Sequence, residues 1–227
     1  MQGASHFAQH GVAVVETVVP RSAAVRLADL QEFSGADRAG QRSFCVPRAV
    51  AALIAPEGVL TELATHLAGK TTRPVRILYF DKKPGANWAV PWHQDRTIAV
   101  ARRIDAPGFG PWTLKAGIDH VEPPEAILHS MVSVRLHIDD CGPDNGPLLA
   151  LRGSFRLGRV VVSEIKRHVD GGAIEVCLAR AGDVVAMRGL TIHASERALR
   201  ARHRRVVHVD YSHAELPCGL EWALSAT

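Results

Sequence analysis

The pattern of apolar and polar positions predicts mainly short β-strands from residue 73 onward. Runs rich in valine, isoleucine and leucine recur there at strand length, separated by turn sequences such as KKPGA, CGPDNGP, VDGGA and AGD. Strands at this spacing are typical of an all-β sandwich or barrel, such as a double-sheet jelly roll. The predicted strands cover residues 74–80, 87–93, 130–140, 147–153, 173–179, 182–189, 191–195 and 204–212.

Residues 1–72 carry a mixed pattern of strand and helix. The apolar run GVAVVETVVP at 11–20 predicts a strand, and helical periodicity follows near 21–33. A second helical stretch near 49–69 is interrupted at Pro56-Glu57-Gly58, because proline and glycine both break helices. A chain of 227 residues suffices for one sizeable core, so these elements are expected to flank a single domain, 1–227.

One long connection, residues 101–127, interrupts the strand pattern and is rich in proline and glycine. Connections of this length are usually functional. We therefore expect a lid loop over a β-rich core of residues 73–213. Trp112 and Lys115 in this segment are candidate substrate contacts, although lid residues often serve only as a cover.

The strand predicted at 130–140 alternates cleanly, so its two faces have different character. Its apolar face is expected to join the core. Arg135 and His137 lie on the polar face, and they either line an internal cavity or point to water. The apolar positions are Val132, Val134, Leu136 and Ile138, and the polar positions are Ser133, Arg135, His137 and Asp139.

The composition is that of a soluble globular protein, with 47% hydrophobic and 22% charged residues. No run of 18 apolar residues suggests a membrane span, and the N-terminus lacks the pattern of a secretory signal peptide. The four cysteines show no CxxC spacing, so we expect reduced thiols in a cytoplasmic protein. They are Cys45, Cys141, Cys177 and Cys218.

The stretch VPWHQDR, residues 90–96, carries the first candidate chemistry. His93 and Asp95 are two positions apart, so on a strand both side chains point to the same face, as two ligands of one metal ion must. His193 follows another predicted strand and is the candidate third ligand. Two histidines and one carboxylate form the facial triad of non-haem Fe(II) oxygenases, which leaves three coordination positions open.

These residues, together with LHIDDCGPDNGPLLALRGSFRLG at 136–158, GDVV at 182–185, HAS at 193–195 and Arg204-Arg205, resemble the phytanoyl-CoA dioxygenase family of Fe(II)/2-oxoglutarate oxygenases. The resemblance extends from about residue 73 to residue 213. It implies a mainly β fold with flanking helices, namely the double-stranded β-helix or cupin-like jelly roll. It also implies that His93, Asp95 and His193 are the iron ligands and catalytic centre.

The resemblance further implies 2-oxoglutarate and O2 as co-substrates, with hydroxylation of a small-molecule metabolite and release of succinate and CO2. The family places a basic residue about eleven positions after the distal histidine to hold the far carboxylate, and a helping hydroxyl near it. Those positions are Arg204 and Ser195 here. A guanidinium pairs a carboxylate with two bonds, which suits this role. Arg205 is the second choice.

Other assignments rest on position alone. Arg76 is a candidate 2-oxoglutarate contact, and Tyr79 a candidate substrate contact, because both precede the metal motif on the adjoining strand. The family's P-G-S-H turn reads Arg152-Gly153-Ser154-Phe155 here, which affects substrate contacts and not the iron site. Because Asp95 is present, hydroxylation is favoured over halogenation, for which relatives replace this carboxylate with a small residue.

Three alternatives remain open on the sequence. The first is a cupin-type metal enzyme that does not use 2-oxoglutarate, and the second a non-catalytic relative acting as a binding protein. The third is nucleic-acid binding through the basic run at 197–205. That run is short and overlaps the proposed anchor, so no nucleic-acid or membrane partner is expected. The basic groups Lys115 and Arg135 point instead to an acidic small molecule as substrate.

Overall fold

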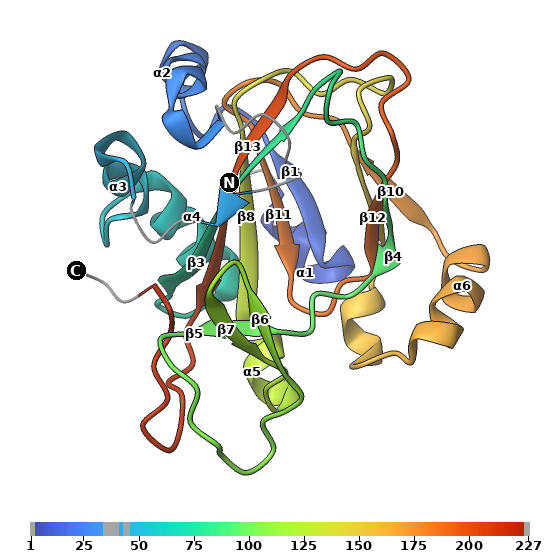
Figure 1. Ribbon diagram of the computed structural model, residues 1–227. Helices are drawn as coiled ribbons and strands as arrows, with labels where there is room; N and C mark the ends of the chain where they lie inside the picture. Colours follow the sequence, from blue (N-terminus) through green and yellow to red (C-terminus); the bar gives the residue numbers. More distant parts are fainter. Residues whose placement is uncertain (1–2, 34–40, 43–45, 225–227) are drawn as a thin grey trace.

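Two facing antiparallel sheets form the centre of the molecule (Figure 1). The structure is a computed structural model that describes residues 3–33, 41–42 and 46–224. The large sheet has the order β1-β11-β8-β13-β3-β2, and the small sheet the order β10-β9-β12-β4. A third sheet, β5-β7-β6, lies at one end of the molecule. This is the predicted jelly roll with flanking helices.

The elements have the following bounds. The strands are β1 (Val12–Val15), β2 (Gln41–Arg42), β3 (Arg73–Lys82), β4 (Val90–His93), β5 (Ile98–Val100), β6 (Trp112–Lys115), β7 (Ile118–Val121), β8 (Met131–His137), β9 (Leu148–Leu151), β10 (Ile174–Cys177), β11 (Val184–Arg188), β12 (His193–Ser195) and β13 (Arg204–Ser212). The helices are α1 (Ala4–His10), α2 (Arg21–Arg26), α3 (Arg48–Ile54), α4 (Val59–Ala68), α5 (Glu125–His129) and α6 (Val162–Asp170), with short 3-10 turns η1 (Leu27–Asp29), η2 (Gln31–Phe33) and η3 (Ser154–Leu157).

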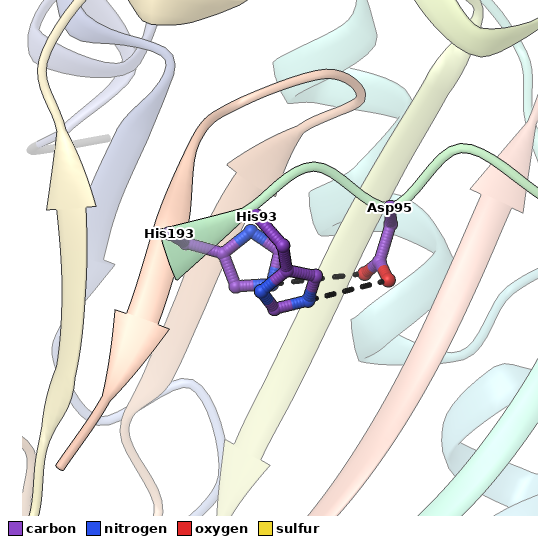
Figure 2. Close-up of side chains that lie close together, drawn as sticks. All are labelled: His93, Asp95 and His193. Carbon is purple, nitrogen blue, oxygen red and sulfur yellow. Dashed lines mark ion pairs between the residues drawn. The ribbon is translucent and has the colours of Figure 1, made fainter. Parts of the chain in front are cut away.

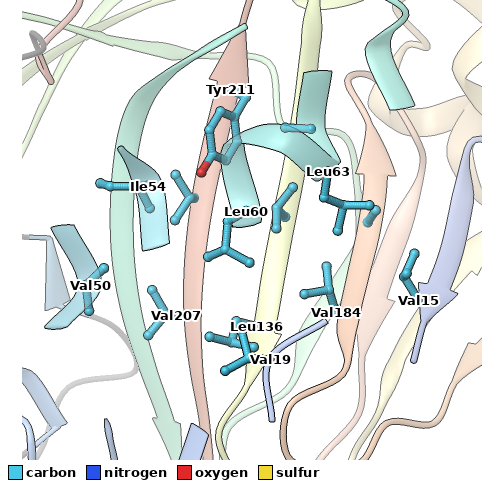
Figure 3. Close-up of a cluster of buried hydrophobic side chains, with 14 of the residues drawn as sticks. Val15, Val19, Val50, Ile54, Leu60, Leu63, Leu136, Val184, Val207 and Tyr211 are labelled. Atoms are coloured by element: carbon cyan, nitrogen blue, oxygen red, sulfur yellow. The ribbon is translucent and has the colours of Figure 1, made fainter. Parts of the chain in front are cut away.

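The main hydrophobic core lies between α4 and the outer face of the large sheet (Figure 3). Leu60, Leu63, Ala64 and Leu67 recur at helical spacing, so they form one buried stripe on α4. The helix ends at Gly69, whose left-handed φ of 70° suits glycine. The sheet contributes its outward-facing apolar residues to this core, namely Val134, Leu136, Val207, Val209 and Tyr211.

Alternation along the three central strands sends their other residues inward, toward the small sheet. On β13 the inward residues begin with Arg204, which is the cross-strand partner of Lys82 on β3. His208 is the partner of Arg135 on β8. The inner face of the large sheet is therefore unusually polar for a sandwich, because it borders a cavity rather than a closed core.

The segment 101–127 is not the predicted loop. It contains β6 and β7, which form a hairpin around Ala116-Gly117, and the start of α5. Both turn residues have positive φ, 53° and 79°. The prediction was wrong because this turn lacks the usual Asn-Gly or Asp-Gly signal, while the surrounding prolines and glycines suggested a loop. Whether the segment moves as a lid stays a prediction.

The segment Arg48–Ala68 is, by length and composition, apolar enough to cross a membrane, which is weak evidence because core helices pass the same test. In the structure it is two helices, α3 and α4, and α4 contributes to the main core. Among the described cysteines, Cys141 and Cys177 are buried, Cys218 is exposed and all three are free thiols. Cys45 lies outside the described residues.

Candidate active site

The structure brings His93, Asp95 and His193 together, and their ligand atoms all lie within 4.8 Å of one another (Figure 2). His93 ends β4 and His193 begins β12, and the two are cross-strand partners. Asp95 follows β4, and its carboxylate oxygens lie 3.8 Å from Nε2 of each histidine. The arrangement matches a facial triad of two histidines and one carboxylate.

The backbone fixes which nitrogen of each histidine faces the centre. Nδ1 of His93 lies 2.8 Å from the carbonyl of Pro91, and Nδ1 of His193 lies 2.9 Å from the carbonyl of Thr191. A carbonyl only accepts, so each Nδ1 carries the proton and donates it. Each Nε2 therefore keeps a free lone pair, which is the arrangement of metal-binding histidines. These residues fit a divalent metal ion.

The electrostatics of the triad suit a cation as well. Burial by itself would raise the pKa of Asp95, but His193 and Arg76 outweigh it and hold the pKa well below its usual range. Burial lowers the pKa of His193 to about 3, so this ring is neutral at physiological pH. A carboxylate anion and a neutral imidazole are the forms in which these side chains bind metals.

A cavity of about 360 Å³ lies between the two sheets and includes the triad. Its apolar wall includes Phe80, Trp88, Leu148 and Val206. Its other residues include an excess of basic groups. They are Arg76, Lys115, Arg135 and Arg204.

Arg204 and Ser195 lie together in the cavity wall, and they begin β13 and end β12 respectively. Arg204 donates from one terminal nitrogen to Ser195 Oγ at 3.2 Å and to the carbonyl of Gly146. The guanidinium forms no ion pair with a carboxylate of the described residues. A half-buried guanidinium with only neutral partners among the described residues, facing a cavity, is suited to bind an incoming carboxylate.

Arg76 lies beside the triad, but a carboxylate already engages it. Its Nε donates to Asp210 at 2.5 Å, and His208 Nε2 lies 2.8 Å from the other oxygen of Asp210. Burial would raise the pKa of Asp210, yet Arg76 and His208 lower it to about 2. His208 and Asp210 lie at even-numbered positions of β13, as Arg204 does, but were given no role from the sequence. Their alternation with Arg204 was the available signal.

Arg135 and His137 both line the cavity, as one of the two readings of their strand predicted. Arg135 Nε and His137 Nδ1 are buried without a hydrogen-bond partner among the described residues. Burial, Arg204 and Arg135 together lower the pKa of His137 to about 3. Lys115 of β6 also reaches the cavity, where its ammonium donates to the Thr97 hydroxyl at 3.1 Å.

Two predicted substrate contacts lie elsewhere. Tyr79 is 1% exposed and packs edge-on against Phe33 in the main core, on the helix-covered face of the large sheet. Tyr79 and Arg76 are three positions apart on β3, so they point to opposite faces. Trp112 packs against a separate apolar cluster, with the Arg103 guanidinium 5.3 Å from its ring centroid, and does not line the cavity.

Lys82 was given no role from the sequence, although it lies beside Ser195 in the structure. It is 0% exposed, and its Nζ donates to Ser195 Oγ at 3.0 Å and to the carbonyl of Glu196 at 2.5 Å. The signal was available, because Lys82 has the same parity on β3 as Arg76, Leu78 and Phe80.

The fold and the triad together define a mononuclear metal enzyme of the jelly-roll class. The family model of phytanoyl-CoA dioxygenase (PhyH) matches residues 7–206, so the chain belongs to that family. This confirms the predicted class, the Fe(II)- and 2-oxoglutarate-dependent oxygenases. No curated protein matches the sequence significantly.

Solved structures share the fold at low sequence identity. AviO1 from Streptomyces viridochromogenes Tue57 has a TM-score of 0.65 and 19% identity, with 95% of each chain covered. The non-heme alpha-ketoglutarate-dependent carbocyclase SnoK from nogalamycin biosynthesis has a TM-score of 0.69 and 15% identity, covering 94% of this chain and 84% of its own. EctD from S. alaskensis, with 2-oxoglutarate and 5-hydroxyectoine, has a TM-score of 0.65 and 16% identity, covering 92% and 74%.

Proposed function

We propose that this protein uses Fe(II), 2-oxoglutarate and O2 to hydroxylate a small acidic metabolite. The single observation that carries the proposal is that one cavity has a facial triad and, in the same wall, a half-buried arginine whose partners among the described residues are all neutral. A metal chelated by a keto acid needs both features, because 2-oxoglutarate carries a second carboxylate. A cupin-type enzyme without this co-substrate needs no such arginine.

The roles of the residues follow from their positions. His93, Asp95 and His193 would hold the iron, and Arg204 with Ser195 would bind the far carboxylate of 2-oxoglutarate. When bound, the iron and the keto acid supply an oxidative decarboxylation that yields succinate and CO2 and oxidises the substrate. The chain contributes orientation and a cavity wall that limits the access of water.

The solved structures support this assignment by analogy of fold. EctD contains 2-oxoglutarate and 5-hydroxyectoine, and HygX from Streptomyces hygroscopicus contains nickel and 2-oxoglutarate. Other neighbours are described as a carbocyclase and an epimerase, so the same fold supports several oxidations. Asp95 completes the triad, which favours hydroxylation or a related oxidation over halogenation. Analysis of the product distinguishes hydroxylation from cyclisation or epimerisation.

The balance of charges supports an acidic substrate. Asp210 already pairs with Arg76, and Asp95 would be neutralised by the metal. Arg204 would take the far carboxylate of 2-oxoglutarate. Arg135 then remains in the cavity with no carboxylate partner among the described residues, and Lys115 adds a second positive charge. An anionic group on the substrate would supply the carboxylate partner that Arg135 lacks among the described residues.

The direct test is the charge-transfer absorption that a keto acid chelated to facial-triad Fe(II) gives near ~500 nm. The protein is purified without oxygen, and Fe(II) and 2-oxoglutarate are added in turn. We expect a band that needs both additions. Bound iron without the band would favour the cupin-type alternative, and failure to bind iron would favour a non-catalytic relative.

A further inference from the structure

The buried Lys82 at the end of β3 has no carboxylate partner within the part of the chain that the structure describes. Its ammonium donates only to the Ser195 hydroxyl and the Glu196 carbonyl, and no carboxylate of the described residues forms an ion pair with it. The adjacent Lys83 does form such a pair, with Asp81 at 3.8 Å. Apart from the oxygens of Ser195 and Glu196, the Lys82 ammonium faces the ring of Trp88, whose centroid lies 5.5 Å from Nζ. Burying an ammonium among neutral groups is costly, so this position suits the binding of an anion.

A second, half-buried cation lies directly beside Lys82. Arg204 is its cross-strand partner on β13, and both side chains donate to the same oxygen, Ser195 Oγ, at 3.0 and 3.2 Å. Burial and the charge of Arg204 lower the pKa of Lys82 to about 8. Two like charges on one hydroxyl repel each other, and a bound carboxylate would relieve this repulsion.

The two cations also determine the direction in which Ser195 can donate. A hydroxyl has two lone pairs and one hydrogen. The lone pairs of Ser195 Oγ accept from Lys82 and Arg204, so the hydrogen is left to donate. It now points to the carbonyl of Gly146 at 3.1 Å, which Arg204 also contacts. An arriving carboxylate can take that hydrogen, because it is a stronger acceptor than a carbonyl.

We propose that Lys82 is a positioning residue for the far carboxylate of 2-oxoglutarate. Lys82 lies behind the cavity wall, while Ser195, Arg204 and Trp88 line it. It acts by holding Ser195 as a hydrogen donor and by adding a second positive charge next to Arg204. This inference rests on the proposed function, because it needs 2-oxoglutarate as the co-substrate.

The test compares two keto acids on Lys82→Met and wild type. 2-Oxopentanoate has the same carbon chain as 2-oxoglutarate but lacks the far carboxylate. Each keto acid is added stepwise to the anaerobic Fe(II) protein, and the absorbance of the charge-transfer band gives its affinity. We expect Lys82→Met to lower the affinity for 2-oxoglutarate about ten- to a hundredfold, as the loss of a charge-assisted hydrogen bond would. The affinity for 2-oxopentanoate should fall by less than about twofold.

Two further variants make the result decisive. Lys83→Met, a neutralised lysine at the adjacent position, should bind both keto acids like wild type. Lys82→Arg keeps the charge and should recover most of the 2-oxoglutarate affinity, which also covers the case in which Lys82→Met does not fold. If Lys82→Met lowers the affinity for both keto acids equally, or changes neither affinity, the inference is overturned and the proposed function still stands. Absence of the band in wild type would instead overturn the proposed function itself.

Discussion

His93 and His193 are cross-strand partners, and each donates its Nδ1–H to the carbonyl of the residue two positions before it. The same local bond on two neighbouring strands aims both Nε2 atoms at Asp95. The metal-binding geometry is thus built from backbone that is already ordered by the small sheet. The backbone alone therefore orients both histidines for a metal ion.

Loss of either histidine should abolish the metal centre. In His93→Ala or His193→Ala, two ligands remain, and we expect Fe(II) affinity to fall by at least about a hundredfold and the charge-transfer band to disappear. Titration of the anaerobic protein with Fe(II) measures this. His129→Ala is the control, because His129 is on the exposed face of α5 and pairs with Glu125. Unchanged iron binding in both triad variants would refute the assigned site.

Gly146 should be indispensable to the carboxylate-binding end of the cavity. Its φ is +60°, and a Cβ there would lie 2.6 Å from the Glu196 carbonyl oxygen and 3.1 Å from Lys82 Nζ. Gly146→Ala should therefore cost about 1–3 kcal/mol in the free energy of unfolding and also weaken 2-oxoglutarate binding. Urea unfolding and band titration check this.

Gly117→Ala separates backbone strain from crowding at Gly146. Gly117 has a similar positive φ of +79° but open space around its Cβ position. We expect a smaller loss in the free energy of unfolding, from backbone strain alone, and normal 2-oxoglutarate binding. Normal binding in both glycine variants would contradict the placement of the carboxylate.

Asp210 should make stability depend on acid pH. Arg76 and His208 hold its pKa at about 2 in the folded state, against an ordinary value of 3.8. A depressed carboxyl pKa stabilises the fold above the unfolded-state value, and that contribution is lost as the pH falls from about 4 toward 2. It amounts to about 2 kcal/mol.

Asp210→Asn measures this contribution. At pH 6 the free energy of unfolding of the variant should be about 3 kcal/mol lower than that of wild type, because the charge of Arg76 is left without its carboxylate partner. The difference from wild type should shrink at pH 3, as urea unfolding at both pH values would reveal. Asp105→Asn, whose side chain is 79% exposed, is the control and should show almost no difference. A gap that stays constant with pH would argue against the depressed pKa.

Arg135→Met should stabilise the ligand-free protein while removing a contact for the substrate. The guanidinium is largely buried in the cavity without an ion pair, and burial lowers its pKa. Replacing it with an apolar chain should raise the free energy of unfolding by about 1–3 kcal/mol. The 2-oxoglutarate band should keep its titration midpoint. A lost band would instead assign Arg135 to the co-substrate.

Much of this architecture is visible in the sequence. Strand alternation located β3, β8 and β13, and Pro56-Glu57-Gly58 correctly separated α3 from α4. His93 and Asp95 are identifiable as a candidate pair because residues two apart share one face of an extended chain, although Asp95 lies just beyond the end of β4. These features depend on neighbours in sequence, for which local geometry is sufficient.

Some features could not be predicted, because they depend on which part of the fold covers each face of a strand. Alternation shows that Arg76 and Tyr79 point in opposite directions, but not which one meets the cavity, since helices cover one face of β3 and the small sheet lies over the other. The hairpin of β6 and β7 was hidden by an Ala-Gly turn without a strong local preference.

The sequence by itself located most strands of the two facing sheets, and it identified the candidate metal ligands and the candidate arginine that follows them. Only the tertiary structure decided that Lys82 and Arg204 meet on one hydroxyl, and that Asp210 neutralises Arg76. These pairs are 122 and 134 residues apart in the chain. The physical reason is that charges separated by such distances in sequence interact only after strand register has brought them side by side.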